Sequence, residues 1–259
     1  MRRRPLSPDR LVLPWPAPER YKAIQNLPRL GWCWELLRRN PNYRACYRDL
    51  GGRGQPVPQR WPLLAFENPD LDAAAAQVFW RRADCAAVLP LMALAEGFES
   101  DAGQFLVEHL ACGIRVYKDP SRDVAHVLFT QSGRALQLEI DGASRLPNAV
   151  LATPALPPPG LRRARLLAVR RLVDLMRKGS LRALHYPREH SRARLAYVLQ
   201  AFDGEQAGVS HRDIALALVG PARVEREWHG SQNALRDHVR KTIGRGRFLT
   251  ESGYRRFLS

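Results

Sequence analysis

The segment from residue 210 to residue 247 constrains the fold most, because its pattern predicts two short helices joined by a turn. Ser210 can cap the first helix, and Asp213, three positions later, completes a capping box. Apolar residues then recur at helical spacing until Gly220 and Pro221, which are typical of a helix end. The first predicted helix therefore has a defined start, an apolar stripe and a defined stop.

The second predicted helix of this segment has one apolar side and one polar side. Ser231 can cap it, and Gly244 with Gly246 is expected to end it. Its apolar side consists of Leu235, Val239 and Ile243. At about 100° per residue, the opposite side consists of Asn233, Arg236, Asp237, Arg240 and Lys241. One side can therefore pack while the other presents basic and hydrogen-bonding groups.

Such a helix meets the requirements of a recognition helix in the major groove of DNA, although any surface helix has a polar side. Arginine can pair bidentately with guanine, and asparagine with adenine. We expect four residues to read bases: Asn233, Arg236, Arg240 and Lys241. Six further residues are expected to contact phosphates: His211, Arg212, Arg245, Arg247, Arg255 and Arg256.

The connection between the two predicted helices is longer than usual. Helix-turn-helix connections ordinarily take about three or four residues, whereas the segment from Gly220 to Gly230 supplies eleven. Trp228 lies within it and is expected to be a packing anchor. The sequence leaves two interpretations open, a variant of the motif and a chance resemblance to it.

The net charge of +16, with an isoelectric point near 10.7, indicates a polyanionic partner such as nucleic acid or an anionic membrane surface. Residues 160–259 contain 21 Lys or Arg against 9 Asp or Glu, a net charge of +12. Residues 1–159 contain 20 against 16, a net charge of +4. The basic residues therefore concentrate around the predicted helices, which favours double-stranded DNA as the partner.

No targeting or metal-binding pattern is evident. The N-terminal residues are basic but lack a continuous apolar core, so we expect no secretory signal. The longest apolar run, from Cys85 to Ala95, contains a proline and is too short to span a bilayer. We therefore expect a cytoplasmic, nucleoid-associated protein without a membrane partner. The four cysteines are irregularly spaced, which predicts reduced and mostly buried thiols, no metal site and no cofactor.

The predicted fold class is α+β, with a small antiparallel β-meander followed by a mostly helical C-terminal region. Residues 1–25 are rich in proline and arginine and are expected to form a disordered lead. Residues 26–60 contain two predicted short helices, and residues 61–156 form a mixed region that includes the meander. Residues 160–259 form the predicted helical DNA-binding region, with the helix-turn-helix at 210–244.

The mixed region contains an alanine-rich stretch with helical character and four runs that predict antiparallel strands, at residues 114–117, 124–130, 136–140 and 149–153. An arginine-rich helix follows. It is expected to expose its arginines and to bury Leu166, Val169, Val173 and Met176. The next helix, from about residue 191 to residue 202, is expected to bury Leu195, Val198, Leu199 and Phe202.

Two segments carry a family resemblance. Over residues 161–258 the chain resembles the proteobacterial family catalogued as domain of unknown function 2285. Two stretches carry this resemblance: HYPREHSRARLAYVLQAFDGEQAGVSHRDIALALVG and SQNALRDHVRKTIGRGRFLTESGYRRFL. It resembles the small regulator-like N-terminal domain catalogued as 6499 in GWCWELLRRNPNYRACYRDL. The paired resemblance implies a DNA-binding transcriptional regulator linked to transfer of integrative and conjugative elements. It also implies that the long inter-helix loop is a family feature.

Two other classes of function remain as alternatives. Some members of the resembled family are antiactivators, which implies a protein-interaction module that binds another regulator. A tyrosine recombinase is the second alternative, because His185 to Arg188 matches H-x-x-R and Tyr254 could be a downstream nucleophile. We find no matching context for the other basic catalytic residues of a recombinase, and we expect no enzyme. Another regulator, RNA polymerase and a second copy of the chain are candidate partners besides DNA.

Overall fold

The computed structural model describes residues 13–94, 110–119, 121–145, 150–152, 162–229 and 233–259. The chain forms two compact units, each built from segments that are far apart in the sequence. The helical unit consists of residues 1–52, 68–73 and 188–257. The sheet unit consists of residues 53–67, 74–187 and 258–259. Both ends of the chain therefore contribute to the helical unit.

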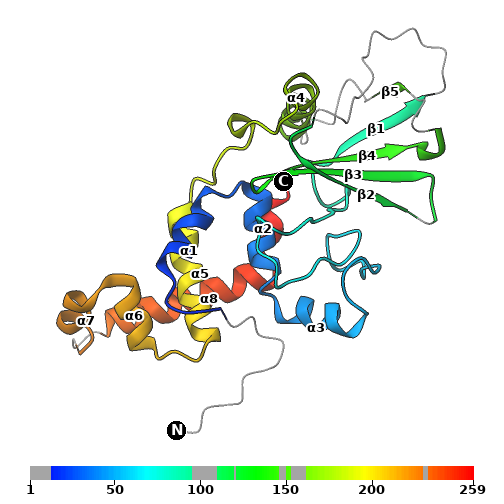
Figure 1. Ribbon diagram of the computed structural model, residues 1–259. Helices are drawn as coiled ribbons and strands as arrows, with labels where there is room; N and C mark the ends of the chain where they lie inside the picture. The colour runs from blue at the N-terminus through cyan, green and yellow to red at the C-terminus, as the bar shows by residue number, and fades with distance from the viewer. Residues whose placement is uncertain (1–12, 95–109, 120, 146–149, 153–161, 230–232) are drawn as a thin grey trace. The chain divides into compact units, whose positions relative to one another are not determined.

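The helical unit contains helices from both ends of the chain (Figure 1). Its elements are α1 (Pro18–Ala23), η1 (Ile24–Asn26), α2 (Arg29–Leu37), α3 (Pro41–Asp49), α5 (Arg192–Gln206), α6 (His211–Val219), α7 (Pro221–Glu227), α8 (Ala234–Glu251) and η6 (Gly253–Phe257). Helix α8 packs against α5, α6 and α7, and α2 packs against η6. The two long helices α5 and α8 therefore form the centre of this unit.

The two predicted N-terminal helices are confirmed as α2 and α3. They are separated at Asn40, whose side-chain oxygen accepts hydrogen bonds from the backbone N–H groups of Asn42 and Tyr43. Pro41 takes the first position of α3, where a helix needs no donor. Local sequence chemistry thus sets both the end of α2 and the start of α3.

The predicted disordered lead differs from the structure in part. Residues 1–12 lie outside the described residues, but α1 forms inside the predicted lead. Tyr21 on α1 is buried, and its hydroxyl donates a 3.0 Å hydrogen bond to Asp203 Oδ2 on α5, 182 residues further along the chain. Trp15 Nε1 donates a 2.9 Å hydrogen bond to Gln200 O. Local composition cannot predict this order, because both partners are distant in the sequence.

The sheet unit contains a five-stranded sheet with strand order β2-β3-β4-β1-β5. The strands are β1 (Leu89–Leu94), β2 (Gly113–Lys118), β3 (Val124–Gln131), β4 (Arg134–Asp141) and β5 (Val150–Ala152). Strands β2, β3 and β4 form the predicted antiparallel meander. Strand β1 pairs in parallel with β4 and antiparallel with β5, so the whole sheet is mixed. The α+β fold class is confirmed, and the fourth predicted strand pairs with β1, outside the meander.

The prediction of an alanine-rich helix is wrong, because residues 72–88 contain turns and isolated bridges, and residues 89–94 form β1. Distant side chains satisfy the backbone there. Ala73 N donates a 2.8 Å hydrogen bond to Glu35 Oε1. Gln137 accepts from Trp80 N and donates to Trp80 O, both at 2.8 Å. Tertiary hydrogen bonds therefore override the helix propensity of alanine.

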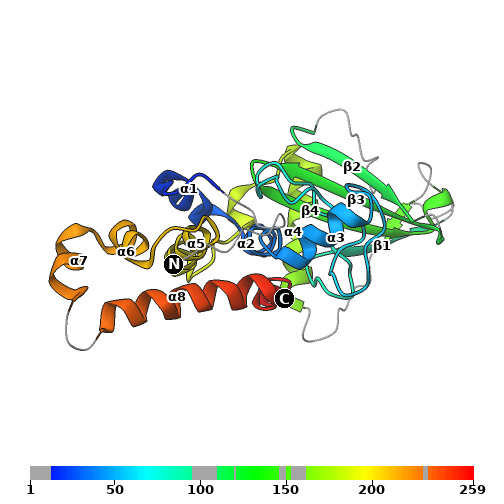
Figure 2. The same ribbon diagram turned by 90° about the horizontal axis from the view of Figure 1, so that it is seen from below.

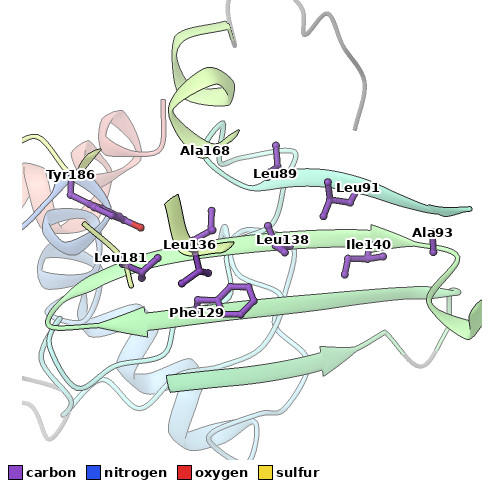
Figure 3. Close-up of a cluster of buried hydrophobic side chains, with 11 residues drawn as sticks. Leu89, Leu91, Ala93, Phe129, Leu136, Leu138, Ile140, Ala168, Leu181 and Tyr186 are labelled. Carbon is purple, nitrogen blue, oxygen red and sulfur yellow. The ribbon is translucent and has the colours of Figure 1, made fainter. Parts of the chain in front are cut away.

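Helix α4 (Arg162–Lys178) packs on one face of the sheet (Figure 1). Alternate residues of β4 point to the same face as residues of β1 and form an apolar core beneath the helix (Figure 3). This core consists of Leu89, Leu91, Ala93, Phe129, Leu136, Leu138, Ile140, Ala168, Leu175, Leu181 and Tyr186. The remaining short elements of this unit are η3 (Ala143–Arg145) and η5 (Ala183–His185).

The helix α4 is confirmed, but its predicted buried stripe is wrong. Leu166, Val173 and Met176 are 59%, 44% and 47% exposed, respectively. Val169 is partly buried against the core. The buried side consists of Arg165, Ala168, Arg171 and Leu175. The helix is thus turned by about one residue position, or about 100°, from the predicted orientation.

Two buried arginines account for this error. Arg165 Nη1 donates to Val88 O, and Arg171 donates from Nε and Nη2 to His185 O at 3.1 and 2.9 Å. The Arg171 guanidinium also lies 4.2 Å from the centroid of the Tyr186 ring. Burial lowers the pKa of both arginines. The long apolar stem of arginine can line a core when carbonyl groups accept its N–H donors.

The cysteines agree with the predicted burial. Cys33, Cys46 and Cys85 are buried, Cys112 is partly buried, and all four are free thiols. Burial raises the pKa of Cys85 to about 11. Among the described residues, no helix is both long enough and apolar enough to cross a membrane.

Candidate nucleic-acid interface

Helix α6 begins and ends as predicted. Ser210 Oγ accepts a 3.2 Å hydrogen bond from Asp213 N and donates one of 2.6 Å to Asp213 Oδ2. Gly220 follows the helix with φ of 81°, a conformation that glycine adopts without steric cost. His211 and Arg212 lie exposed in the first turn. The local pattern of caps thus places these two basic residues at the surface.

The prediction of an eleven-residue turn between the two helices is wrong, because that segment contains the helix α7. Gly220 alone separates α6 from α7. Pro221 takes the first position of α7, where its fixed φ suits a helix. Val224, one turn later, is fully buried. The pair Gly220-Pro221 therefore ends one helix and starts the next.

Helices α6 and α7 follow each other beside α8 in the helical unit (Figure 2). The three helices share one apolar core that includes Trp228. Its members are Ala201, Ile214, Ala215, Val224, Trp228, Leu235, Val239 and Ile243. The three predicted apolar residues of α8 are all buried in it. Full burial of an aliphatic side chain contributes about 1.5–3 kcal/mol, so this core determines which side of α8 stays exposed.

Helix α8 is longer than predicted at its C-terminal end. It continues through Gly244 and Gly246, which were expected to end it. Gly246 is buried against α5, whereas a Cβ atom at Gly244 would meet nothing within 4 Å. The predicted cap Ser231 lies outside the described residues. Asn233 precedes the first turn with φ of 50°, a left-handed conformation that asparagine tolerates better than most residues.

The base-reading candidates lie in or just before the N-terminal half of α8, and all four are exposed. The Arg236 guanidinium lies 5.4 Å from the centroid of the Trp228 ring. Arg240 Nη2 lies 2.8 Å from Asp237 Oδ1, and these side chains are 71% and 45% exposed. An ion pair so exposed contributes at most about 1 kcal/mol, so a stronger partner can displace it. Arg236, Arg240 and Lys241 are thus accessible on the side of α8 that does not pack.

The phosphate-contact candidates are not equally available. Arg247 Nη2 donates to both carboxylate oxygens of Glu205 on α5 at 2.8 Å, so it already joins α8 to α5. Three other candidates each place a guanidinium group over an aromatic ring near the C-terminus. The distance to the ring centroid is 5.0 Å for Arg245 over Phe248, 5.7 Å for Arg255 over Tyr254 and 4.7 Å for Arg256 over Phe257. Stacking of this kind orients the N–H donors of arginine.

A buried ion network, which sequence reasoning missed, joins α2 to α5. Arg39 Nη1 lies 2.5 Å from Glu35 Oε2, and Arg39 Nε and Nη2 lie 2.8 and 2.9 Å from the two oxygens of Asp203. All three side chains are 1% exposed. Arg38 and Tyr21 extend the network with hydrogen bonds to Glu35 and Asp203, respectively. The network attaches the N-terminal helices to α5, which in turn packs against α8.

The network holds Glu35 and Arg39 in their charged forms at neutral pH. Burial raises the pKa of Glu35, but the positive charges of Arg39 and Arg38 outweigh burial and hold that pKa at about 2. Burial lowers the pKa of Arg39, but Asp203 and Glu35 reverse this effect and raise it above its usual value. The spacing of Arg38 and Arg39 from Glu35, at i+3 and i+4, was the local signal for this network.

Two models of known protein families match parts of the chain. Residues 134–259 match the RovC DNA-binding family, described as "T6SS, Transcription factor, DNA binding domain". Residues 14–81 match the "Proteobacterial transcriptional regulator-like domain". The chain is a DNA-binding transcriptional regulator. Neither match carries the names of the two families that the sequence resembles. Searches of the curated proteins and of the solved structures found no match.

Tyr254 and His185, on which the recombinase alternative depends, each have local contacts within their own unit. Tyr254 is buried, whereas a nucleophile that bonds to DNA must be accessible. His185 Nε2 lies 2.7 Å from Asp174 Oδ2, and Arg182 also pairs with Asp174 at 3.5 Å. His185 is therefore a member of a local ion-pair cluster within the sheet unit.

Proposed function

We propose that the regulator binds specific DNA sequences by placing α8 in the major groove. The observation that carries this proposal is the division of α8 into a packed side and an exposed basic side. In this proposal, Arg236 and Arg240 read guanine, and Lys241 and Asn233 complete the base contacts. Helices α6 and α8 then form a variant helix-turn-helix whose connection contains α7.

The exposed arginines next to α8 would hold the DNA backbone. His211, Arg212, Arg245, Arg255 and Arg256 contact phosphates in this proposal, and Arg247 exchanges Glu205 for a phosphate. The net charge of +12 over residues 160–259 supports such a partner, because counterion release from phosphates drives association.

The cellular part of the proposal follows from the sequence resemblance. The regulator would act in the cytoplasm, on the nucleoid, in the transfer of an integrative or conjugative element. Binding as a homodimer to a pseudo-palindromic site suits motifs of this kind. RNA polymerase or a second regulator would then be the protein partner.

Footprinting on genomic sites bound by the full chain tests the proposal. The double variant Arg236→Ala/Arg240→Ala should lose about 1–3 kcal/mol per base contact and should relax specificity at those positions. The matched control is Arg223→Ala/Arg226→Ala, which removes the same charge from exposed residues of α7. The control should keep the wild-type ratio of specific to nonspecific affinity. A footprint that the α8 variant leaves unchanged would overturn the assignment.

One observation favours a second candidate function, the binding of another regulator without DNA contact. Leu166, Val173 and Met176 form an exposed apolar side on α4, and such surfaces are typical of protein interfaces. A gel-shift experiment at moderate salt distinguishes the two functions. Retained binding of a partner protein with no DNA shift would support the second candidate.

A further inference from the structure

A second group of basic side chains lies in the helical unit where the start of α2 meets the segment before α5. Pro28 forms an antiparallel bridge with Arg188, which brings the start of α2 beside residues 188 and 189. Arg29 Nη1 then lies 3.3 Å from Glu189 Oε2, and the Arg29 side chain stays 44% exposed. The first turn of α2 therefore presents a guanidinium group at the surface of the helical unit.

Arg29 also contacts the C-terminal element η6. Its Nη2 donates a 2.5 Å hydrogen bond to Arg256 O. Its guanidinium lies 5.7 Å from the centroid of the Phe257 ring, and the Arg256 guanidinium lies 4.7 Å from the same centroid. Phe257 itself is buried. One fixed aromatic ring thus positions two guanidinium groups from opposite ends of the chain.

These cations repel one another. Burial lowers the pKa of Arg256, and the charges of Arg245 and Arg29 lower it further, whereas Glu189 raises it. Glu189 offsets part of this repulsion in the isolated protein, and a bound anion would offset more of it. Arginine stacked on a ring presents its N–H groups in a fixed fork that suits the oxygens of a phosphate.

We propose that Arg29 and Arg256 together bind a backbone phosphate of DNA. This inference rests on the proposed function, and it adds a residue from the N-terminal regulator-like segment to the DNA-binding surface. Arg29 lies in the match over residues 14–81, and Arg256 lies in the match over residues 134–259. The site therefore joins the two matched domains. A phosphate contact carries no sequence information, so Arg29 supplies affinity and not specificity.

Salt titration of the full chain tests this site. Binding to a specific duplex and to a scrambled duplex is measured by fluorescence anisotropy between about 50 and 200 mM salt. Arg29→Gln should weaken binding to both duplexes by the same factor and should reduce the slope of log K against log salt by about 0.9. Arg29→Lys keeps the charge and should keep most of the slope. The control Lys22→Gln removes one exposed charge from the same matched segment, where Lys22 pairs with Glu19, and should retain the wild-type slope.

The outcomes separate this inference from the proposed function. A wild-type slope in Arg29→Gln, together with a specific wild-type footprint, overturns the phosphate site alone. A wild-type chain that binds neither duplex overturns both proposals. Thermal unfolding of each variant shows whether the loss of the bonds from Arg29 to Glu189 and Arg256 O alters the fold. A purely structural role would lower the unfolding temperature and leave the salt slope of the remaining folded protein unchanged.

Discussion

Gly246 of α8 lies so close to Phe202 of α5 that a Cβ atom at position 246 would come within 2.6 Å of the Phe202 Cβ. The Val198 carbonyl oxygen, at 3.3 Å, limits the space further. Cβ atoms do not approach each other so closely, and Phe202 cannot move its own Cβ by changing rotamer. The separation of the two long helices of the helical unit therefore depends on glycine at this position.

Alanine at this position should push α5 and α8 apart. We expect Gly246→Ala to lower the free energy of unfolding by about 1–3 kcal/mol, although alanine favours a helix. Gly244→Ala is the matched control, since its added Cβ meets nothing within 4 Å. The control should raise stability by up to about 1 kcal/mol. Urea denaturation measures both, and equal midpoints would contradict the packing argument.

Removal of Arg39 should be far more costly than removal of an exposed arginine. Arg39→Met leaves Glu35 and Asp203 buried without their shared cation, and breaking such a pair costs about 3–5 kcal/mol. Arg240→Met breaks an exposed pair and should change the free energy of unfolding by at most about 1 kcal/mol. Chemical denaturation of the two variants checks this, and comparable losses would disprove a special role for the buried network.

Stability should fall in acid because of Glu35. Its pKa is about 2 in the folded chain, below its usual value of 4.5, so the folded state binds a proton less readily than the unfolded state. The contribution of Glu35 is fully present above about pH 4.5 and is lost as the pH falls through about 2. Thermal unfolding across this window should show a weaker pH dependence in Glu35→Gln than in the wild type. Identical pH profiles would exclude Glu35 as the source.

The orientation of α4 can be tested with two leucines of the same helix. Leu175→Ala should lower the free energy of unfolding by about 2–5 kcal/mol, because Leu175 is fully buried in the core on the sheet. Leu166→Ala should change it by no more than about 0.5 kcal/mol, because Leu166 is exposed. A larger loss of stability in Leu166→Ala than in Leu175→Ala would instead support the buried stripe that the sequence predicts. Differential scanning calorimetry gives the comparison.

The elements that the sequence predicted correctly are those with local causes. The break between α2 and α3 depends on Asn40 and Pro41, which cap and start α3. The start of α6 depends on Ser210 and Asp213, which contact each other directly. The meander follows from alternating strands with turn residues between them. In each case the interacting groups are only a few residues apart, so the pattern alone is sufficient.

The errors have causes that are distant in the sequence. The orientation of α4 depends on the carbonyl groups that Arg165 and Arg171 reach. Gly246, within α8, packs against Phe202 of α5, and Val224 of α7 shares its core with Ala201 of α5 and Ile243 of α8.

Some features of the candidate site could also be predicted from the local sequence, and others required the fold. The exposed side of α8 followed from helical periodicity, because Leu235, Val239 and Ile243 all pack on the other side. The pairing of Arg247 with Glu205 and the position of Arg29 beside Arg256 required the fold. Their sequence neighbours give no sign of these contacts.

The contribution of both chain ends to the helical unit has a consequence for synthesis. Asp203 follows Arg39 by 164 residues, which a bacterial ribosome translates in about 8–33 s. During that interval the chain lacks the Asp203 carboxylate that completes the ion network of Arg39. A transcript cut short before codon 203 yields a product that lacks both this network and α8. If α8 reads DNA as proposed, such a product cannot occupy the sites of the full chain and cannot compete with it there.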